Sequence, residues 1–211
     1  MNYQKELDKV LDKYGNENKK LFLHSCCAPC SSYVIEYLSQ YFDIVVFYYN
    51  PNITEQTEYK KRAKEQQRLI SSMPHKHKVE FLEGVYEPDL FFSMARGLEK
   101  CREGEERCFG CYELRLRKTA IEAKMRGFDY FTTTLTISPL KKAEIINEIG
   151  MRLEKVYDIS FLPSDFKKRN GYLRSIELSK EYNLYRQDYC GCCYSKAARE
   201  AEKEITNAKD D

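Results

Sequence analysis

The sequence has neither a strong excess of one charge nor a long apolar run. Its 35 basic and 33 acidic residues leave a formal net charge of +2, which argues against a protein coated with basic residues for nucleic-acid binding. No apolar segment approaches the length of a membrane span. The first residues are polar and partly acidic, which is not typical of a secretory signal. We therefore expect a cytoplasmic protein with no membrane partner.

Repeats, low-complexity tracts and linkers rich in Pro, Gly or Ser are also missing. A chain of 211 residues is long enough for one good hydrophobic core. The sequence therefore predicts a single domain over residues 1–211. Within it we expect a helical lead-in over 1–19 that ends near Gly15, a core over 20–196 and a C-terminal helix over 197–211.

Short apolar or β-branched runs alternate with helical patterns along the core. The clearest strand covers residues 43–50, and the others are expected at 21–23, 78–83 and 130–135. This alternation is typical of an α/β fold with a parallel sheet flanked by helices.

Three helix starts are indicated by capping residues and proline. Pro29 suits the first turn of a helix because its φ is preset and its missing N–H is not needed there. Ser138 followed by Pro139 predicts an N-cap and a first helical residue. Asn52, with Glu55 three residues later, predicts another N-cap.

Cysteine is what the sequence has in quantity. There are nine cysteines, an odd number, and no secretory signal, so metal binding or redox chemistry is favoured over structural disulfides. Seven of the nine fall into three clusters: Cys26, Cys27 and Cys30; Cys108 and Cys111; Cys190 and Cys192.

The three clusters together hold more thiols than one tetrahedral zinc ion can use. This count suggests an iron–sulfur cluster, of the 4Fe–4S type, together with either an additional iron or a catalytic dithiol. Zinc alone and a purely thiol site remain alternatives. We expect His24, next to the first cluster, to be a packed, hydrogen-bonded residue and not a metal ligand.

Several separated motifs resemble the QueH-type epoxyqueuosine reductases. The first is Leu-His-Ser-Cys-Cys-Ala-Pro-Cys-Ser-Ser, and the last long one is Tyr-Arg-Gln-Asp-Tyr-Cys-Gly-Cys. In chain order, the motifs lie at residues 23–32, 49–53, 106–111, 129–139, 165–168, 171–172, 185–192 and 194–195. The resemblance therefore covers most of the chain, from about residue 20 to residue 196.

The resemblance implies an enzyme that reduces epoxyqueuosine to queuosine at the wobble base of tRNA, as the last step of queuosine biosynthesis. It also implies a fold like that of the PP-loop or HUP-type nucleotide-handling enzymes, and an external electron donor. The seven clustered cysteines match the motif cysteines of the family, whereas Cys101 and Cys193 do not. We therefore expect only the seven to bind metal.

The reaction also needs a proton donor and contacts to tRNA. Removing an epoxide oxygen as water consumes two electrons and two protons, and we expect the acid to be Tyr49, Asp165 or Tyr189. Unpaired bases of RNA loops are bound by aromatic stacking and arginine contacts. For substrate binding we expect basic side chains of short charged runs and of the last motif: Arg62, Lys142, Lys168 and Arg186.

Two other functions fit parts of the sequence. One is a zinc-stabilised RNA-binding module without catalysis. The other is an ATP-using sulfur transferase of the PP-loop type. The second is disfavoured because Ser25-Cys-Cys-Ala-Pro-Cys lacks the glycines that let a backbone wrap around phosphate.

Overall fold

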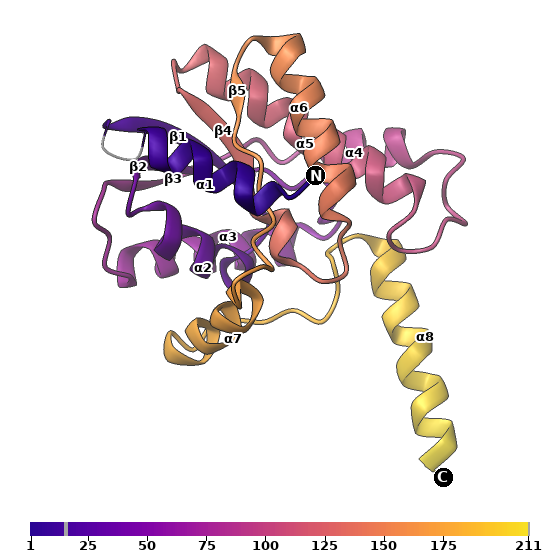
Figure 1. The fold of residues 1–211 in the computed structure, drawn as a ribbon. Coiled ribbons are helices and arrows are strands. Elements are labelled where there is room, and N and C mark those ends of the chain that lie inside the picture. Colours follow the sequence, from indigo (N-terminus) through magenta and orange to yellow (C-terminus); the bar gives the residue numbers. More distant parts are fainter. Residues whose placement is uncertain (15–16, 211) are drawn as a thin grey trace.

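Alternating hydrophobic side chains place the first strand at the centre of the molecule. In the computed structural model, which describes residues 1–14 and 17–210, Leu21 and Leu23 of this strand pack into one core, and Phe22 between them packs into a second core. A strand that is apolar on both faces suits a sheet covered by helices on both sides. Figure 1 shows this arrangement.

The sheet has five strands, all parallel, in the order β3-β2-β1-β4-β5. The predicted α/β class with a parallel sheet flanked by helices is therefore confirmed. The elements are α1 (Tyr3–Tyr14), β1 (Lys19–Ser25), α2 (Ala28–Leu38), β2 (Phe42–Tyr48), α3 (Gln56–Ser72), β3 (Val79–Glu83), α4 (Pro88–Ala95), α5 (Glu106–Met125), β4 (Tyr130–Thr133), a 3₁₀ turn η1 (Thr134–Ile137), α6 (Ala143–Tyr157), β5 (Ser160–Phe161), α7 (Gly171–Glu181) and α8 (Cys193–Asp210).

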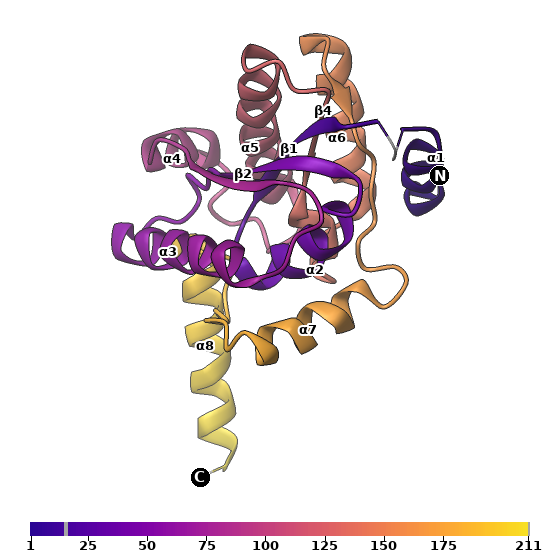
Figure 2. The same cartoon turned by 90° about the vertical axis from the view of Figure 1, so that its left-hand side faces the viewer.

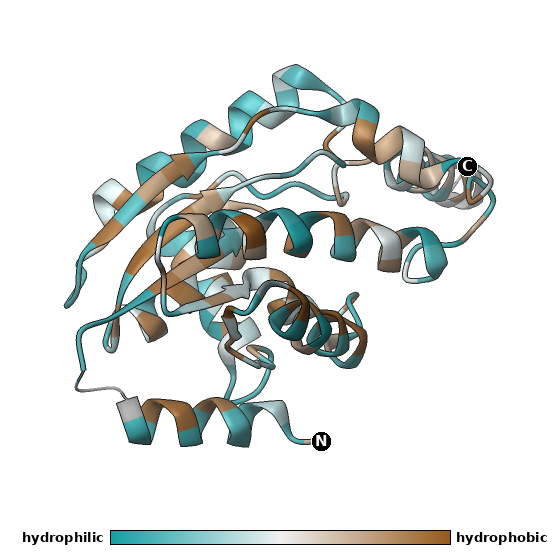
Figure 3. Cartoon of the chain, turned by 90° about the horizontal axis from the view of Figure 1, so that it is seen from above, coloured by the Kyte–Doolittle hydropathy of each residue, from teal (hydrophilic) through white to brown (hydrophobic). Residues whose placement is uncertain are grey.

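Helices cover the sheet on both faces. The core built around Leu21 contains side chains from α1, α2 and α3, whereas the core built around Phe22 contains side chains from α5 and α6. α7 packs against α2, and α8 leaves the body of the molecule as a projecting helix (Figures 1 and 2). Apolar residues gather on the sides of the helices that face the sheet (Figure 3).

The strand order identifies where a ligand is expected to bind. The chain passes from β1 to β2 on one side and returns to β4 on the other side of β1. In open parallel sheets, the crevice beyond the carboxyl ends of the two strands at such a reversal is the usual binding site. Cys26 follows β1 and Thr134 follows β4, so the first cysteine cluster lies at this point.

Two of the three predicted helix starts are wrong. Helix α2 begins at Ala28 with Pro29 in its first turn, as predicted. Helix α6 begins at Ala143, because residues 138–141 form a turn closed by a hydrogen bond from Lys141 N to Ser138 O. Helix α3 begins at Gln56, and Asn52 does not cap it.

The ends of the chain agree with the expected helices within the described residues. Helix α1 covers the predicted lead-in, but its predicted end near Gly15 lies outside the described residues. Helix α8 starts a few residues before the predicted C-terminal helix. None of the helices in the described ranges is both long enough and apolar enough to cross a membrane.

Candidate metal and substrate site

The first group of thiols lies on the short loop between β1 and α2. Cys27 occupies the N-cap position of α2 with an extended backbone, and Cys30 lies within the first turn of that helix. The sulfurs of Cys26, Cys27 and Cys30 all lie within 4.8 Å of one another, and those of Cys26 and Cys27 are 3.8 Å apart. We call these three residues the loop thiols.

A buried glutamine fixes both ends of this loop. The Oε1 atom of Gln66 on α3 accepts hydrogen bonds from Ser25 Oγ at 2.6 Å and from Ser31 Oγ at 2.7 Å. These two serines stand just before Cys26 and just after Cys30. One side chain from another helix therefore sets the separation between the end of β1 and the start of α2.

His24 is part of the frame and not of the metal site. Its Nδ1 lies 2.8 Å from Thr133 Oγ1, and its Nε2 lies 3.0 Å from the carbonyl oxygen of Tyr49. The ring is completely buried. Burial, with the nearby charge of Arg115, lowers the pKa of His24 to about 3, so the ring is neutral at physiological pH. The prediction that His24 is packed and hydrogen-bonded is confirmed.

The second group of thiols is assembled from two distant segments. Cys108 and Cys111 lie in the first turns of α5, and Cys190 and Cys192 lie immediately before α8. Cys111 and Cys192 pack together in a small apolar cluster. We call these four residues the assembled thiols.

Gly191 lets the C-terminal segment approach closely enough for this assembly. Its φ of +124° is a conformation that other residues rarely adopt, and a Cβ there would lie 2.8 Å from Cγ1 of Ile53. Its carbonyl oxygen accepts a hydrogen bond from Thr54 N, and the carbonyl oxygen of Cys190 accepts one from Arg62 Nη1 at 3.0 Å. The backbone of the segment is therefore held against the loop after β2 and against α3.

The two groups differ in how readily their thiols ionise. Hydrogen bonds from Cys27 and Cys30 hold the pKa of Cys26 well below its usual range, while the pKa of Cys27 rises to about 12. The loop thiols thus share one thiolate. Burial, reinforced by the charge of Cys190, raises the pKa of Cys111 to about 11 and that of Cys192 to about 12.

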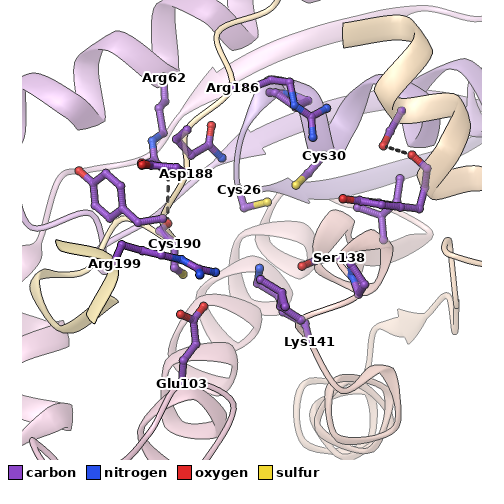
Figure 4. A pocket seen from close by; sticks show the side chains of 18 of the residues that line it. Cys26, Cys30, Arg62, Glu103, Ser138, Lys141, Arg186, Asp188, Cys190 and Arg199 are labelled. Atoms are coloured by element: carbon purple, nitrogen blue, oxygen red, sulfur yellow. Dashed lines mark hydrogen bonds between the residues drawn. The ribbon is translucent and has the colours of Figure 1, made fainter. Parts of the chain in front are cut away.

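A cavity of about 290 Å³ lies beside both groups. Cys26 and Cys30 line it from the loop, and Cys190 lines it from the C-terminal segment. The close view in Figure 4 shows these sulfurs and the side chain of Lys141 around the same space. The five cationic side chains in its wall are Arg62, Arg115, Lys141, Arg186 and Arg199.

Three of the seven residues expected to donate a proton or to contact substrate line this cavity: Arg62, Tyr189 and Arg186. Arg62 is buried, is paired with Glu58 at 2.6 Å, and lies over the ring of Tyr189. Arg186 donates to Ser179 Oγ at 3.1 Å. Burial raises the pKa of Tyr189, so its phenol holds its proton at neutral pH.

The other four lie elsewhere in the described chain. The hydroxyl of Tyr49 donates to Glu87 at 3.1 Å, and Asp165 pairs with Lys167 at 2.8 Å. The ammonium of Lys142 lies over the ring of Phe109, and the side chain of Lys168 is exposed.

Several cavity residues were not predicted as site residues. One of them is Lys141, which lines the cavity in place of its predicted neighbour Lys142. Glu103, which accepts a hydrogen bond from Ser195 Oγ, had no sequence signal. Arg115 follows Cys111 by four residues, so helical periodicity places both on one face of α5. That spacing was the signal that could have identified it.

The two remaining cysteines differ from the seven. Cys193 is exposed at the start of α8, next to the buried Cys192. Cys101 has its sulfur within 4.8 Å of carboxylate oxygens of Glu105 and Glu106, away from both thiol groups.

The fold and the cysteines together are typical of an α/β protein that binds metal. A parallel α/β sheet carries three thiols at its topological reversal, close enough together to bind metal, and a cationic cavity beside them is also lined by Cys190. A model of the family described as epoxyqueuosine reductase QueH matches residues 21–198. The chain belongs to the QueH family.

Curated relatives carry the same description. The epoxyqueuosine reductase QueH of Staphylococcus epidermidis is 45% identical to this chain over 201 residues, which cover 92% of this chain and 84% of the relative. That of Streptococcus pyogenes is 43% identical and covers 100% of this chain and 84% of the relative. That of Thermotoga maritima is 33% identical and covers 90% and 97%, respectively.

Proposed function

We propose that this chain reduces epoxyqueuosine to queuosine in tRNA at the cationic cavity beside the two thiol groups. The observation that carries this proposal is that cysteines from separated segments lie beside one cationic cavity. Cysteines from two separated segments of a QueH-family chain line one cavity, whose wall also holds arginine, lysine and tyrosine side chains, and Cys111 of a third segment packs against Cys192. This combination provides metal ligands, a proton donor and phosphate-binding groups in one place.

The donor sets of the two thiol groups fit two different metal centres. Four cysteines, as in the assembled thiols, are the usual ligand set of a 4Fe–4S cluster. Two thiolates on one tetrahedral ion lie about 3.8 Å apart when each metal–sulfur bond is about 2.3 Å long. The 3.8 Å between Cys26 and Cys27 matches this spacing. We therefore assign the loop thiols to a single additional iron and the assembled thiols to the cluster.

When bound, these centres supply single electrons and a Lewis acid that polarises the epoxide oxygen. The protein's own residues complete the reaction. Conversion of the epoxide to the alkene takes two electrons and two protons and releases water. Tyr189 is best placed to hold a proton at the cavity, because Tyr49 and Asp165 are engaged outside its wall.

The cavity wall also suits a nucleotide of an RNA loop. Arg186 and Lys141 form no ion pair with a carboxylate in the described ranges, so their charges are available to phosphates. Tyr172 and Tyr189 provide aromatic faces for a base. Lys142 and Lys168 remain candidates for contacts with the rest of the tRNA. An external electron donor completes the set of partners.

We also propose that the fold is of the PP-loop or HUP type, as the sequence motifs imply. Strand order β3-β2-β1-β4-β5 puts a ligand at the end of β1, where nucleotide-handling enzymes bind theirs. In this chain cysteines occupy that position.

The test is metal analysis followed by turnover. Protein purified without oxygen should contain roughly four or more irons with matching sulfide per chain. After reduction it should convert epoxyqueuosine to queuosine in tRNA, as detected by mass spectrometry of digested nucleosides. Binding should weaken as salt rises, because basic side chains contact phosphates.

Two outcomes would contradict the proposal. A colourless protein that holds one zinc ion, lacks sulfide and binds tRNA without turnover would favour the zinc-stabilised RNA-binding module. Equal turnover of the free base and of the intact tRNA would show that the substrate is not tRNA.

A further inference from the structure

Arg115 is a buried cation that has no carboxylate to balance its charge within the described chain. Its side chain lies on α5 and is 1% exposed. Its Nε donates to the carbonyl oxygen of Cys111 at 3.1 Å. Its Nη2 is buried and has no hydrogen-bond partner among the described residues. Burying an unpaired guanidinium is costly, so Arg115 lowers the free energy of unfolding of the metal-free protein.

Arg62 shows what a balanced arginine looks like in the same cavity. It is equally buried and lines the same wall. A carboxylate of Glu58, however, lies 2.6 Å from its Nε. The Nη2 atoms of both arginines are buried without a partner among the described residues, so what distinguishes Arg62 is the carboxylate that balances its charge.

Thiols of both groups lie near Arg115. Its Nε contacts the backbone of Cys111, one helical turn before it. Cys26 of the loop thiols and Cys190 of the assembled thiols line the same cavity as Arg115.

We propose that Arg115 is the counter-cation of the metal centre, compensating the thiolate charge that Cys111, Cys190 and Cys26 acquire when they bind metal. This inference rests on the proposed function, because it concerns the centre assigned above. Cysteines must lose their protons to bind metal, so metal binding brings negative charge to a buried place. The unpartnered Nη2 group supplies the missing positive charge and a hydrogen-bond donor for a sulfur ligand.

Two consequences follow from this role. The metal-free protein carries an uncompensated buried cation, so a methionine of similar length at position 115 should not destabilise it. The reduced centre carries one more negative charge than the oxidised one, so removing Arg115 should make reduction harder and the midpoint potential more negative.

The experiment compares Arg115→Met, Arg115→Lys and Arg117→Met with the unmodified protein. Arg117 lies on the same helix, is about half exposed and pairs with Glu113, so its loss removes the same charge from α5 at the surface. Thermal unfolding is measured for each protein without metal and with metal. The midpoint potential of the reconstituted centre is measured by dye-mediated redox titration.

We expect Arg115→Met to keep or raise the melting temperature of the metal-free protein and to lower that of the metal-loaded protein. Its midpoint potential should shift to more negative values. Arg115→Lys, which keeps the charge, should fall between Arg115→Met and the unmodified protein. Arg117→Met should match the unmodified protein in every measurement.

Equal destabilisation of the metal-free and metal-loaded forms by Arg115→Met would show a purely structural role and overturn the inference. An unchanged potential with a raised KM for tRNA would do the same, because it would make Arg115 a substrate contact. If the unmodified protein binds only zinc, the proposed iron centre is wrong. The comparison of melting temperatures with and without zinc then still decides whether Arg115 compensates thiolate charge.

Discussion

The loop thiols and the assembled thiols are held in place by different interactions. The loop thiols follow one another within a single loop, and a network of hydroxyl and amide groups around Ser25 and Gln66 holds that loop. The assembled thiols come from α5 and from the segment before α8, and Cys111 and Cys192 pack together among apolar side chains such as Phe91. The first group depends on hydrogen bonds from its own loop to one buried glutamine, and the second depends on the packing of two distant segments.

This difference determines how each group meets a metal. Among the loop thiols, Cys26 is already the favoured thiolate, because its neighbours donate hydrogen bonds to it. Cys111 and Cys192 are held as neutral thiols by burial. The pKa values of Cys27 and Cys30 are raised as well, so metal binding releases protons from both groups. Because the assembled thiols come from distant segments, their arrangement should depend more strongly on the metal.

The largest effect is expected from removing an assembled thiol. Cys108→Ser or Cys190→Ser takes away one of the four ligands proposed for the cluster, so iron, sulfide and queuosine formation should all be lost. Cys193→Ser is the matched control, because its side chain is exposed beside Cys192 and should leave iron content nearly intact. Cys101→Ser should behave like the control. Loss of iron in Cys193→Ser with retention in Cys192→Ser would reverse the assignment.

Removing a loop thiol should have a narrower effect. Under the proposed assignment of the two groups to separate centres, Cys30→Ser should cost about one iron per chain and abolish turnover, while the sulfide of the proposed 4Fe–4S cluster remains. Parallel measurement of iron and acid-labile sulfide checks this. A proportional loss of sulfide would mean that Cys30 belongs to the cluster and that the two groups form one site.

Acid should destabilise the frame of the loop thiols through His24. Its pKa falls from 6.5 in the unfolded chain to about 3 in the folded protein, so the unfolded state binds an extra proton between these values. Stability should therefore fall as pH drops below about 6.5, by up to about 1.4 kcal/mol per pH unit from this one group.

Denaturant unfolding of the metal-free protein at several pH values measures this slope. His24→Asn should flatten the slope. His77→Asn is the control, because the His77 side chain is partly exposed, 3.7 Å from Asp43, and it should keep the slope. An unchanged slope in His24→Asn would show that other groups control acid stability.

The smallest effect is expected at Gln66. Gln66→Leu removes the acceptor shared by Ser25 and Ser31, which should cost about 2 kcal/mol of unfolding free energy and loosen the loop thiols. Gln67→Leu, one residue along the same helix with an exposed side chain, should change stability little. If Gln66→Leu slows iron uptake only at the loop thiols, Gln66 supports that group alone. If iron uptake slows equally at both groups, the two groups do not differ in this respect.

Much of the frame was predictable from local patterns. The apolar runs around residues 43–50 and 130–135 predicted strands, because strands buried on both faces must be apolar throughout. Pro29 predicted the start of α2, because proline fits the first helical turn whatever surrounds it. Cys26, Cys27 and Cys30 were predicted to lie close together because they share one short loop.

The failures fall where long-range contacts override local signals. Ser138 and Pro139 read as a helix start, yet residues 138–141 form a turn that lines the cavity and places Lys141 there. Local propensity cannot anticipate this, because the turn follows β4 at the point where the chain meets the loop thiols. Tyr49 and Asp165 were chosen by type and motif, but their neighbours Glu87 and Lys167 engage them outside the cavity wall.

By itself, the sequence determined the α/β class, the seven clustered cysteines and the family, because each depends on residue types in a fixed order along the chain. Only the tertiary structure decided which thiols meet, which of the expected acids and bases face the cavity, and that Arg115 is buried there with no carboxylate partner among the described residues. Those features depend on distances between segments that are remote in sequence. Such distances are set by the packing of helices on the sheet and not by any local pattern.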